Sequence, residues 1–140
     1  MADTAGRLLV CDLPTDITVE WLEVRRADSG EILLVPTDDA PFCGACDVRL
    51  NGGTAFGVRQ GDRFARCGVS VWVQPEDLGR HKPHEVGTVS PRELASVRRV
   101  LADLARGRPM PDAAADDDPE YWALTRELEN LGLVLSGGRV

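Results

Sequence analysis

The stretch from Val69 to Gly107 reads VSVWVQPEDLGRHKPHEVGTVSPRELASVRRVLADLARG, which predicts a strand, a long polar connection and a helix. At its start, valines alternate with Ser70 and Trp72, and this two-residue period in β-branched and aromatic residues is typical of a strand. Pro75 cannot donate to a strand ladder, so we expect the strand to end before it and a polar connection to follow.

The helix signal in this stretch begins with Ser90, Pro91 and Glu93. The serine can accept a hydrogen bond from a free backbone amide, the proline suits the first helical position, and the glutamate completes a capping box. Apolar residues then recur on one face of the expected helix: Leu94, Val97, Leu101, Leu104 and Ala105. Gly107 follows the last of them, as glycine often does at a helix end, so the pattern predicts a helix over residues 90–106.

The chain before this stretch predicts short strands separated by turns. A hairpin is expected from Ile17–Arg25 and Glu31–Val35, with a turn at 27–30 and with Pro36 ending the second strand. The other strand candidates are short and rich in apolar or alternating residues: Arg7–Asp12, Asp47–Leu50, Phe56–Arg59 and Arg63–Cys67. Frequent short strands followed by one helix predict an α+β protein that is mainly β, built as a small antiparallel barrel.

Length and composition favour a folded protein. With 140 residues, of which 43% are hydrophobic, the chain can form one domain with a hydrophobic core. No apolar run approaches the length of a membrane span, and the N-terminus lacks the charged and apolar segments of a signal peptide. We therefore expect a cytoplasmic protein without a membrane partner, whose four cysteines are reduced.

The acidic charge is concentrated near the C-terminus. Residues 111–140 hold 7 acids and 2 bases, a net charge of −5, whereas residues 1–110 hold 16 acids and 14 bases, a net charge of −2. This split favours a barrel domain over 1–108, an acidic linker over 109–119 and a helical appendage over 120–140. An acidic chain is a poor general binder of nucleic acid, but the near-neutral main domain leaves room for a local basic surface.

Two segments resemble the MazF/PemK-type toxins. Residues 87–107, GTVSPRELASVRRVLADLARG, are similar to the segment in which a Gly-Thr-hydrophobic-Ser/Ala-Pro-x-Glu-Leu run opens the family's last helix. Residues 6–14, GRLLVCDLP, are similar to the family's first strand. The resemblance covers residues 6–107 and is strongest at 86–107. It implies a PemK-like barrel related to SH3-like folds, a homodimer, and metal-independent cleavage of RNA at selected sequences.

The resemblance points to Thr37 and Arg25 as catalytic candidates. RNA cleavage without a metal needs a group that activates the ribose 2′-hydroxyl and a cation that stabilises the transition state. The family supplies a serine or threonine just after a Val-x-Pro strand end, and an arginine after the first strand in a Gly-x-Arg-Pro context. Val35-Pro36-Thr37 matches the strand end here, whereas the Arg-Pro element is absent and Arg25 is a substitute only if the fold brings it close. The alternative is a turn residue at Thr37 and a solvated strand end at Arg25.

A small basic patch, RHKPH, precedes the predicted helix. It contains Arg80, His81, Lys82 and His84. Members of the MazF/PemK family can contact RNA or an antitoxin in this region, so the resemblance implies such contacts here, with Arg26 as a further candidate. The alternative is a set of ordinary solvated side chains, because lone histidines in polar loops are usually exposed.

Cys43 and Cys46 form a Cys-x-x-Cys motif on a glycine-containing loop. Two thiolates at this spacing can bind zinc, and Cys67 is a third candidate ligand. Structural zinc sites need four ligands, however, and a second Cys-x-x-Cys is absent from the sequence. The alternative is a loop with two small thiols and no cofactor, which the implied cleavage reaction does not require.

Three function classes stay open from the sequence. The first is a toxin-family endoribonuclease with a degenerate active site, and the second is a non-catalytic module on the same barrel that binds protein or nucleic acid. The third is a small zinc-stabilised interaction protein. The candidate partners are RNA, an antitoxin-like acidic peptide, and the chain's own acidic tail at 111–135, for which the alternative is an ordinary packed helix.

Overall fold

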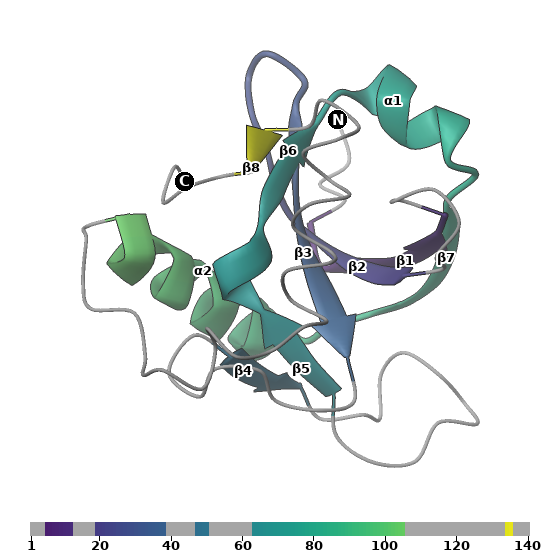
Figure 1. Ribbon diagram of the computed structural model, residues 1–140. Helices are drawn as coiled ribbons and strands as arrows, with labels where there is room; N and C mark the ends of the chain where they lie inside the picture. The colour runs from purple at the N-terminus through teal and green to yellow at the C-terminus, as the bar shows by residue number, and fades with distance from the viewer. Residues whose placement is uncertain (1–4, 13–18, 39–46, 51–62, 106–133, 136–140) are drawn as a thin grey trace, which may run out of the picture.

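The computed structural model describes residues 5–12, 19–38, 47–50, 63–105 and 134–135 (Figure 1). The predicted strand Phe56–Arg59 and the expected acidic linker at 109–119 lie outside these ranges. Among the described residues, no helix has the length and apolar character that crossing a membrane requires.

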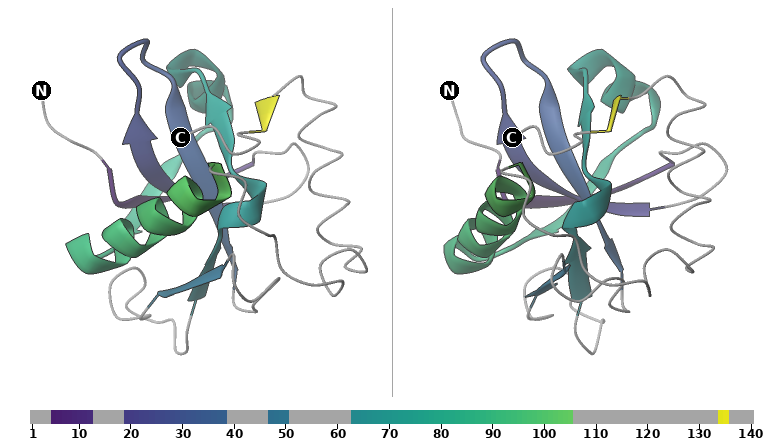
Figure 2. Two further views of the ribbon diagram at one scale, coloured as in Figure 1. Left: turned by 90° about the vertical axis from the view of Figure 1, so that its left-hand side faces the viewer. Right: turned by 60° about the vertical axis from the view of Figure 1, so that its left-hand side comes forward.

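Eight strands in the described part of the chain form one sheet, in which neighbouring strands run antiparallel. Their bounds are β1 (Arg7–Cys11), β2 (Val19–Arg26), β3 (Ile32–Asp38), β4 (Asp47–Leu50), β5 (Arg63–Arg66), β6 (Val71–Val73), β7 (His84–Thr88) and β8 (Val134–Leu135). The main path is β4–β5–β3–β2–β1–β7, and β6 pairs with both β3 and β8. Figure 2 shows the strands fanning out around β3 in a strongly twisted sheet. The prediction of a mainly β, α+β fold is confirmed.

The capping box predicted at the start of the last helix is present. This helix, α2, runs over Pro91–Ala105. The backbone N–H of Ser90 donates to Glu93 Oε1 at 2.9 Å, and the N–H of Glu93 donates to Ser90 Oγ at 3.2 Å. These bonds satisfy amides at the helix start, while Val97 and Leu101 are buried on the apolar face. The predicted helix is therefore confirmed.

Strands β2 and β3 form the predicted hairpin, with Gly30 at a φ of 95° in its turn. Strand β3 continues through Pro36 to Asp38, so the expectation that this proline ends the strand is wrong. On the side away from β2, strand β3 pairs with β6 through Ile32–Leu34 and with β5 from Thr37 onward. Pro36 lies where the partner changes, so its missing N–H interrupts neither pairing.

Residues 75–88 differ from the polar connection expected there. They include a short helix, α1 (Pro75–Arg80), and strand β7, which pairs with β1. Earlier in the chain, the 3₁₀ turn η1 (Cys67–Val69) precedes β6. Pro75 starts α1, where a missing amide donor costs nothing. The β7 sequence HEVGT lacks an apolar alternation and is largely exposed, so pairing with β1 rather than composition makes it a strand.

Apolar side chains are buried on both faces of the sheet. One core lies between the sheet and α2 and contains Leu8, Leu22, Val24, Leu33, Val35, Val48, Leu50, Ala65, Cys67, Trp72, Val89, Val97 and Leu101. The register pairs Leu9 with Trp21 and Leu34 with Val71, and these four residues are buried on the opposite face. Burial on both faces explains why β2 and β3 lack a clean polar and apolar alternation.

Within the helical appendage expected over 120–140, the structure describes only Val134–Leu135, which form a strand. This strand, β8, pairs with Val71 and Trp72 of β6. The chain is extended here because it adds a strand to β6 on the side away from β3. The other residues of the expected appendage lie outside the described ranges.

Candidate functional site

Thr37 lies where three strands meet. It pairs with Glu20 of β2 and with Ala65 of β5. Cross-strand partners point to the same face of a sheet, and residues two apart on one strand do so as well. Glu20, Thr37 and Arg63 therefore share the face of the sheet that carries the α2 core.

A buried ion pair holds these three side chains together. The Arg63 Nη2 atom donates to the backbone carbonyl and to Oγ1 of Thr37, both at 3.0 Å, and forms an ion pair with Glu20 Oε2. The exposed fractions are 7% for Glu20, 4% for Thr37 and 6% for Arg63, so the group lies inside the edge of the core. We call these three residues the Arg63 cluster.

The Arg63 cluster holds the side-chain types that RNA cleavage uses, but in a closed arrangement. A carboxylate can take a proton, and a guanidinium can stabilise the charge of a phosphorane-like transition state. Here the carboxylate of Glu20 and the guanidinium of Arg63 neutralise each other, and Nη2 already has three internal acceptors. Because an unpaired buried charge is costly, burial favours keeping this pair intact.

Sequence reasoning found Thr37 and missed its two partners. Glu20 gave a signal, since it is a charged residue beside Trp21 in an apolar strand that is buried on both faces. Arg63 gave little signal, because the short strand RFAR has no clear alternation. Only the strand register shows that Arg63 and Glu20 meet.

The other arginine of β5, Arg66, lies on the opposite face. Asp38 pairs with Phe64, and Arg66 is two residues from Phe64, so Asp38 and Arg66 point to the same side. Arg66 Nη2 lies 3.4 Å from Asp38 Oδ2. The end of β3 therefore carries an ion pair on each face of the sheet.

Arg25 does not lie beside Thr37. It pairs with Leu33, four residues before Thr37 on β3, which is roughly 13 Å at the usual strand rise. Its side chain is exposed, whereas Thr37 is buried. The two catalytic candidates are thus not brought together within one chain, and the structure places Arg63 at Thr37 instead.

Four of the predicted contact residues lie together at the end of α1 and the start of β7, namely Arg80, His81, Lys82 and His84. The chain turns sharply here, because Lys82 has a φ of 53°. The backbone carbonyl of His81 accepts a hydrogen bond from the N–H of Asp12, and its Nδ1 lies 3.2 Å from the Asp12 carbonyl oxygen. These contacts tie the turn to the end of β1, and its role in binding RNA or a partner stays a prediction.

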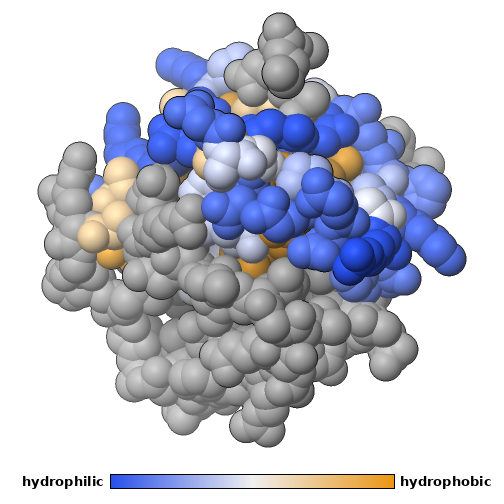
Figure 3. Space-filling view, turned by 90° about the horizontal axis from the view of Figure 1, so that it is seen from above, coloured by the Kyte–Doolittle hydropathy of each residue, from blue (hydrophilic) through white to orange (hydrophobic). Residues whose placement is uncertain are grey.

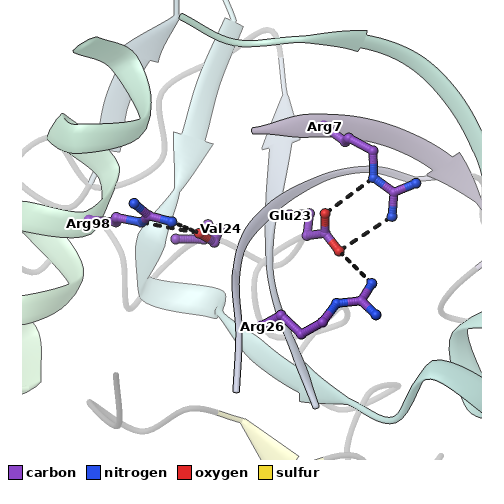
Figure 4. Close-up of polar contacts among 5 residues, drawn as sticks. All are labelled: Arg7, Glu23, Val24, Arg26 and Arg98. Atoms are coloured by element: carbon purple, nitrogen blue, oxygen red, sulfur yellow. Dashed lines mark hydrogen bonds and ion pairs between the residues drawn. The ribbon is translucent and has the colours of Figure 1, made fainter. Parts of the chain in front are cut away.

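Arg26 belongs to a different group of charges, shown in Figure 4. Glu23 accepts at Oε2 from Arg7 Nε and at Oε1 from Arg26 Nη2, both at 3.2 Å. The β1–β7 register pairs Arg7 with Thr88, at the far end of β7 from His84. Arg26 therefore lies away from the basic turn. We call Arg7, Glu23 and Arg26 the Glu23 cluster.

Helix α2 is anchored to β2 next to the Glu23 cluster. The register shift between Glu23 and Arg25 leaves Val24 in a β-bulge. Arg98 donates from Nε and Nη2 to the Val24 carbonyl oxygen, at 3.2 and 2.8 Å (Figure 4). The arginine supplies donors to a carbonyl at the point where the bulge disturbs the ladder.

The zinc prediction rests mostly on residues outside the described ranges. Cys43 and Cys46 lie there. Cys67 is buried, and its thiol donates weakly to the Ala65 carbonyl oxygen at 3.8 Å. Within the part of the chain that the structure describes, no group of three or more His, Cys, Asp or Glu residues is arranged to hold a metal. A structural zinc therefore stays a prediction.

Comparisons with known proteins bear on the fold. No protein-family profile matches this sequence, and no curated protein matches it. Among solved structures, the chain is similar to a chain of the crystal structure of MazE–MazF (form II) from Deinococcus radiodurans, with a TM-score of 0.55 and 18% sequence identity. The match covers 78% of this chain and 99% of that chain. A likeness at this identity concerns architecture alone, and it shows that the protein has a MazF-like fold.

Proposed function

We propose that this protein is a MazF-like RNA-binding protein that does not cleave RNA. Two observations support the proposal. The fold is similar to that of a chain in a MazE–MazF structure, and the sequence resemblance to the MazF/PemK family implies action on RNA. The guanidinium of Arg63, which lies against Thr37, is buried, and its Nη2 is engaged by internal acceptors.

The closed Arg63 cluster is the observation that carries the proposal. A guanidinium stabilises a phosphorane-like transition state only if its donors point at the reacting phosphate. Arg63 is nearly fully buried, and its Nη2 is engaged by Glu20 and Thr37. Freeing it for a substrate would break its buried ion pair with Glu20, which is unfavourable by about 3–5 kcal/mol.

RNA binding without cleavage would use cationic side chains other than Arg63. The main domain is close to neutral, so basic side chains at its surface can attract phosphates without strong general repulsion. Arg80 and Lys82 are exposed at the turn before β7, His84 is exposed at the start of β7, and Arg26 is exposed at the other end of the sheet. In Figure 3 the coloured residues on the face seen from above are mostly hydrophilic, which disfavours a large apolar protein-docking surface there.

The proposal is tested with a long mixed-sequence RNA and a 2′-O-methyl RNA, which cannot be cleaved. We expect the first RNA to stay uncut with and without chelator, and the second to bind with an affinity that falls as salt rises. Absence of binding at low salt, in protein shown to be folded by circular dichroism, would overturn the RNA-binding proposal. Chelator-resistant cuts at one short sequence would overturn the claim that the protein does not cleave.

An endoribonuclease is the second candidate, because a hydroxyl, a guanidinium and a carboxylate do converge in the Arg63 cluster. In this case Thr37→Ala and Arg63→Met would both abolish cuts, whereas Arg25→Ala would leave them unchanged. Cuts that depend on Arg25 instead would support Thr37 and Arg25 as the two catalytic residues, as the sequence resemblance suggested. A preparation with no cuts leaves the binding protein as the better description.

We also propose an acidic partner for the basic turn before β7, either an antitoxin-like peptide or the chain's own acidic tail. The similar solved structure is a MazE–MazF complex, and residues 111–140 carry a net charge of −5. Because Val134–Leu135 pairs with β6, deleting the tail would also remove a strand. Replacing Asp116, Asp117 and Asp118 by asparagine is the cleaner test, and unchanged RNA affinity would exclude masking by this acidic run.

A further inference from the structure

We infer that the Glu23 cluster is a binding site for one phosphodiester group of single-stranded RNA. The two arginines of the cluster would hold the phosphate oxygens, and the hydroxyl of Thr88 would be a further donor. This inference rests on the proposed RNA binding and turns Arg26, a contact candidate from the sequence resemblance, into part of a defined site with Arg7 and Thr88. The Glu23 cluster lies on the opposite face of the sheet from the Arg63 cluster.

Strand register brings the donors of this site together. Arg7 of β1 pairs with Thr88 of β7, so their side chains leave the same face of the sheet. Glu23 accepts from Arg7 Nε at 3.2 Å, from Arg7 Nη2 at 3.4 Å and from Arg26 Nη2 at 3.2 Å. One carboxylate thereby holds two guanidinium groups, one from the start of β1 and one from the end of β2, as Figure 4 shows.

The cluster is fixed on its inner side and open on its outer side. The side chain of Glu23 is 1% exposed, whereas those of Arg7 and Arg26 are 28% and 42% exposed. Each guanidinium carries five N–H donors, and the contacts with Glu23 use only some of them. The buried carboxylate orients the arginines, and their outer N–H groups face solvent, where a ligand can reach them.

The charge of the cluster suits a phosphodiester. Two guanidinium groups and one carboxylate give a net charge of +1, which matches the single negative charge of one phosphodiester. Planar guanidinium groups bind phosphate oxygens through paired N–H donors, a geometry that lysine cannot provide. The Arg63 cluster differs in charge and in exposure. One arginine there faces one carboxylate, so their charges cancel, and both side chains are buried.

A purely structural clamp is the competing explanation for the Glu23 cluster. A clamp between β1 and β2 needs one arginine for one glutamate, and the second arginine adds an excess positive charge near the surface. The clamp explanation predicts that removing Arg26 leaves RNA binding unchanged. The phosphate-site explanation predicts a measurable loss, so binding measurements on the full-length protein separate the two.

The test uses a fluorescein-labelled 12-nucleotide 2′-O-methyl RNA and fluorescence anisotropy across a salt series. We expect Arg26→Gln and Arg7→Gln to weaken binding about fivefold or more, and to reduce the slope of log affinity against log salt by about 0.7, the value for one phosphate contact on a single strand. Arg99→Gln is the matched control, since Arg99 is an exposed arginine of α2, which packs on the other face of the sheet. Wild-type affinity and slope in the Arg26 variant would overturn the inference.

Glu23→Gln gives the opposite expected result and guards against a folding artefact. The amide that replaces the carboxylate keeps one oxygen that can accept from the arginines, and the loss of the negative charge raises the net charge of the cluster by one, so RNA should bind more tightly and with a steeper salt dependence. A destabilised protein would bind more weakly, which is the reverse. Weaker or unchanged RNA binding by a folded Glu23→Gln variant would contradict the inference.

Inorganic phosphate separates failure of the site from failure of the proposed function. If the wild-type protein does not bind the RNA, the proposed function fails, and thermal unfolding in phosphate then decides about the site. A rise in Tm with phosphate that Arg26→Gln abolishes would show that the cluster binds free phosphate rather than RNA. No rise, or an equal rise in wild type and variant, would overturn the site itself.

Discussion

Replacing Arg63 by methionine should strongly destabilise the protein. Glu20 and Arg63 are both almost fully buried, and the same arginine supports Thr37 through two hydrogen bonds of 3.0 Å. Removing one partner of a buried ion pair typically costs about 3–5 kcal/mol, because the other charge stays buried without compensation. The total stability of a domain of this kind is about 5–15 kcal/mol, so the loss would be a large fraction of it.

Urea unfolding followed by circular dichroism measures this loss. With a dependence on urea of about 2 kcal/mol per molar, the expected loss lowers the unfolding midpoint by roughly 2 M. The double variant Glu20→Leu with Arg63→Met should recover much of the stability, since an apolar pair can replace a buried ion pair at little cost. An unchanged midpoint in Arg63→Met would refute the reasoning, because a structural ion pair cannot be removed without loss.

Other substitutions test single contacts. Thr37→Val removes one acceptor of Arg63 and should cost about 1 kcal/mol in the free energy of unfolding, with RNA affinity unchanged. Ser90→Ala removes the helix cap and should cost about 1 kcal/mol, whereas Ser90→Asp should retain most of it. Arg98→Met removes both donors to the Val24 carbonyl and should cost about 1–3 kcal/mol, with faster amide hydrogen exchange at the bulge. Light scattering coupled to size exclusion should report twice the monomer mass if the family's homodimer applies here, and a monomer mass would remove that expectation.

Local signals sufficed for the elements that depend on neighbours in sequence. Helix α2 was predictable because Ser90 and Glu93 cap each other within one turn, and their hydrogen bonds are both present. The β2–β3 hairpin was predictable because β-branched and apolar runs flank a turn with Gly30 in a positive-φ conformation.

Elements that depend on distant pairing were not predictable in the same way. Strand β7 carries little strand character in HEVGT and exists because it pairs with β1. Pro36 looked like a strand end, yet it lies where β3 exchanges one partner strand for another. Most of the candidate site could not be predicted because it also depends on distant strand pairing. Arg63 meets Thr37 only through the register of β3 with β5.

Incubation of the full-length protein in excess over a long mixed-sequence RNA, with mapping of new 5′ ends, tests the central claim most directly. Wild type and Arg63→Met are compared, each with and without chelator, alongside binding of the 2′-O-methyl RNA. The account predicts binding by the wild type and no new 5′ ends in any sample. Chelator-resistant ends at one short sequence in the wild type, absent from a folded Arg63→Met variant, would contradict it and would make the Arg63 cluster an active site.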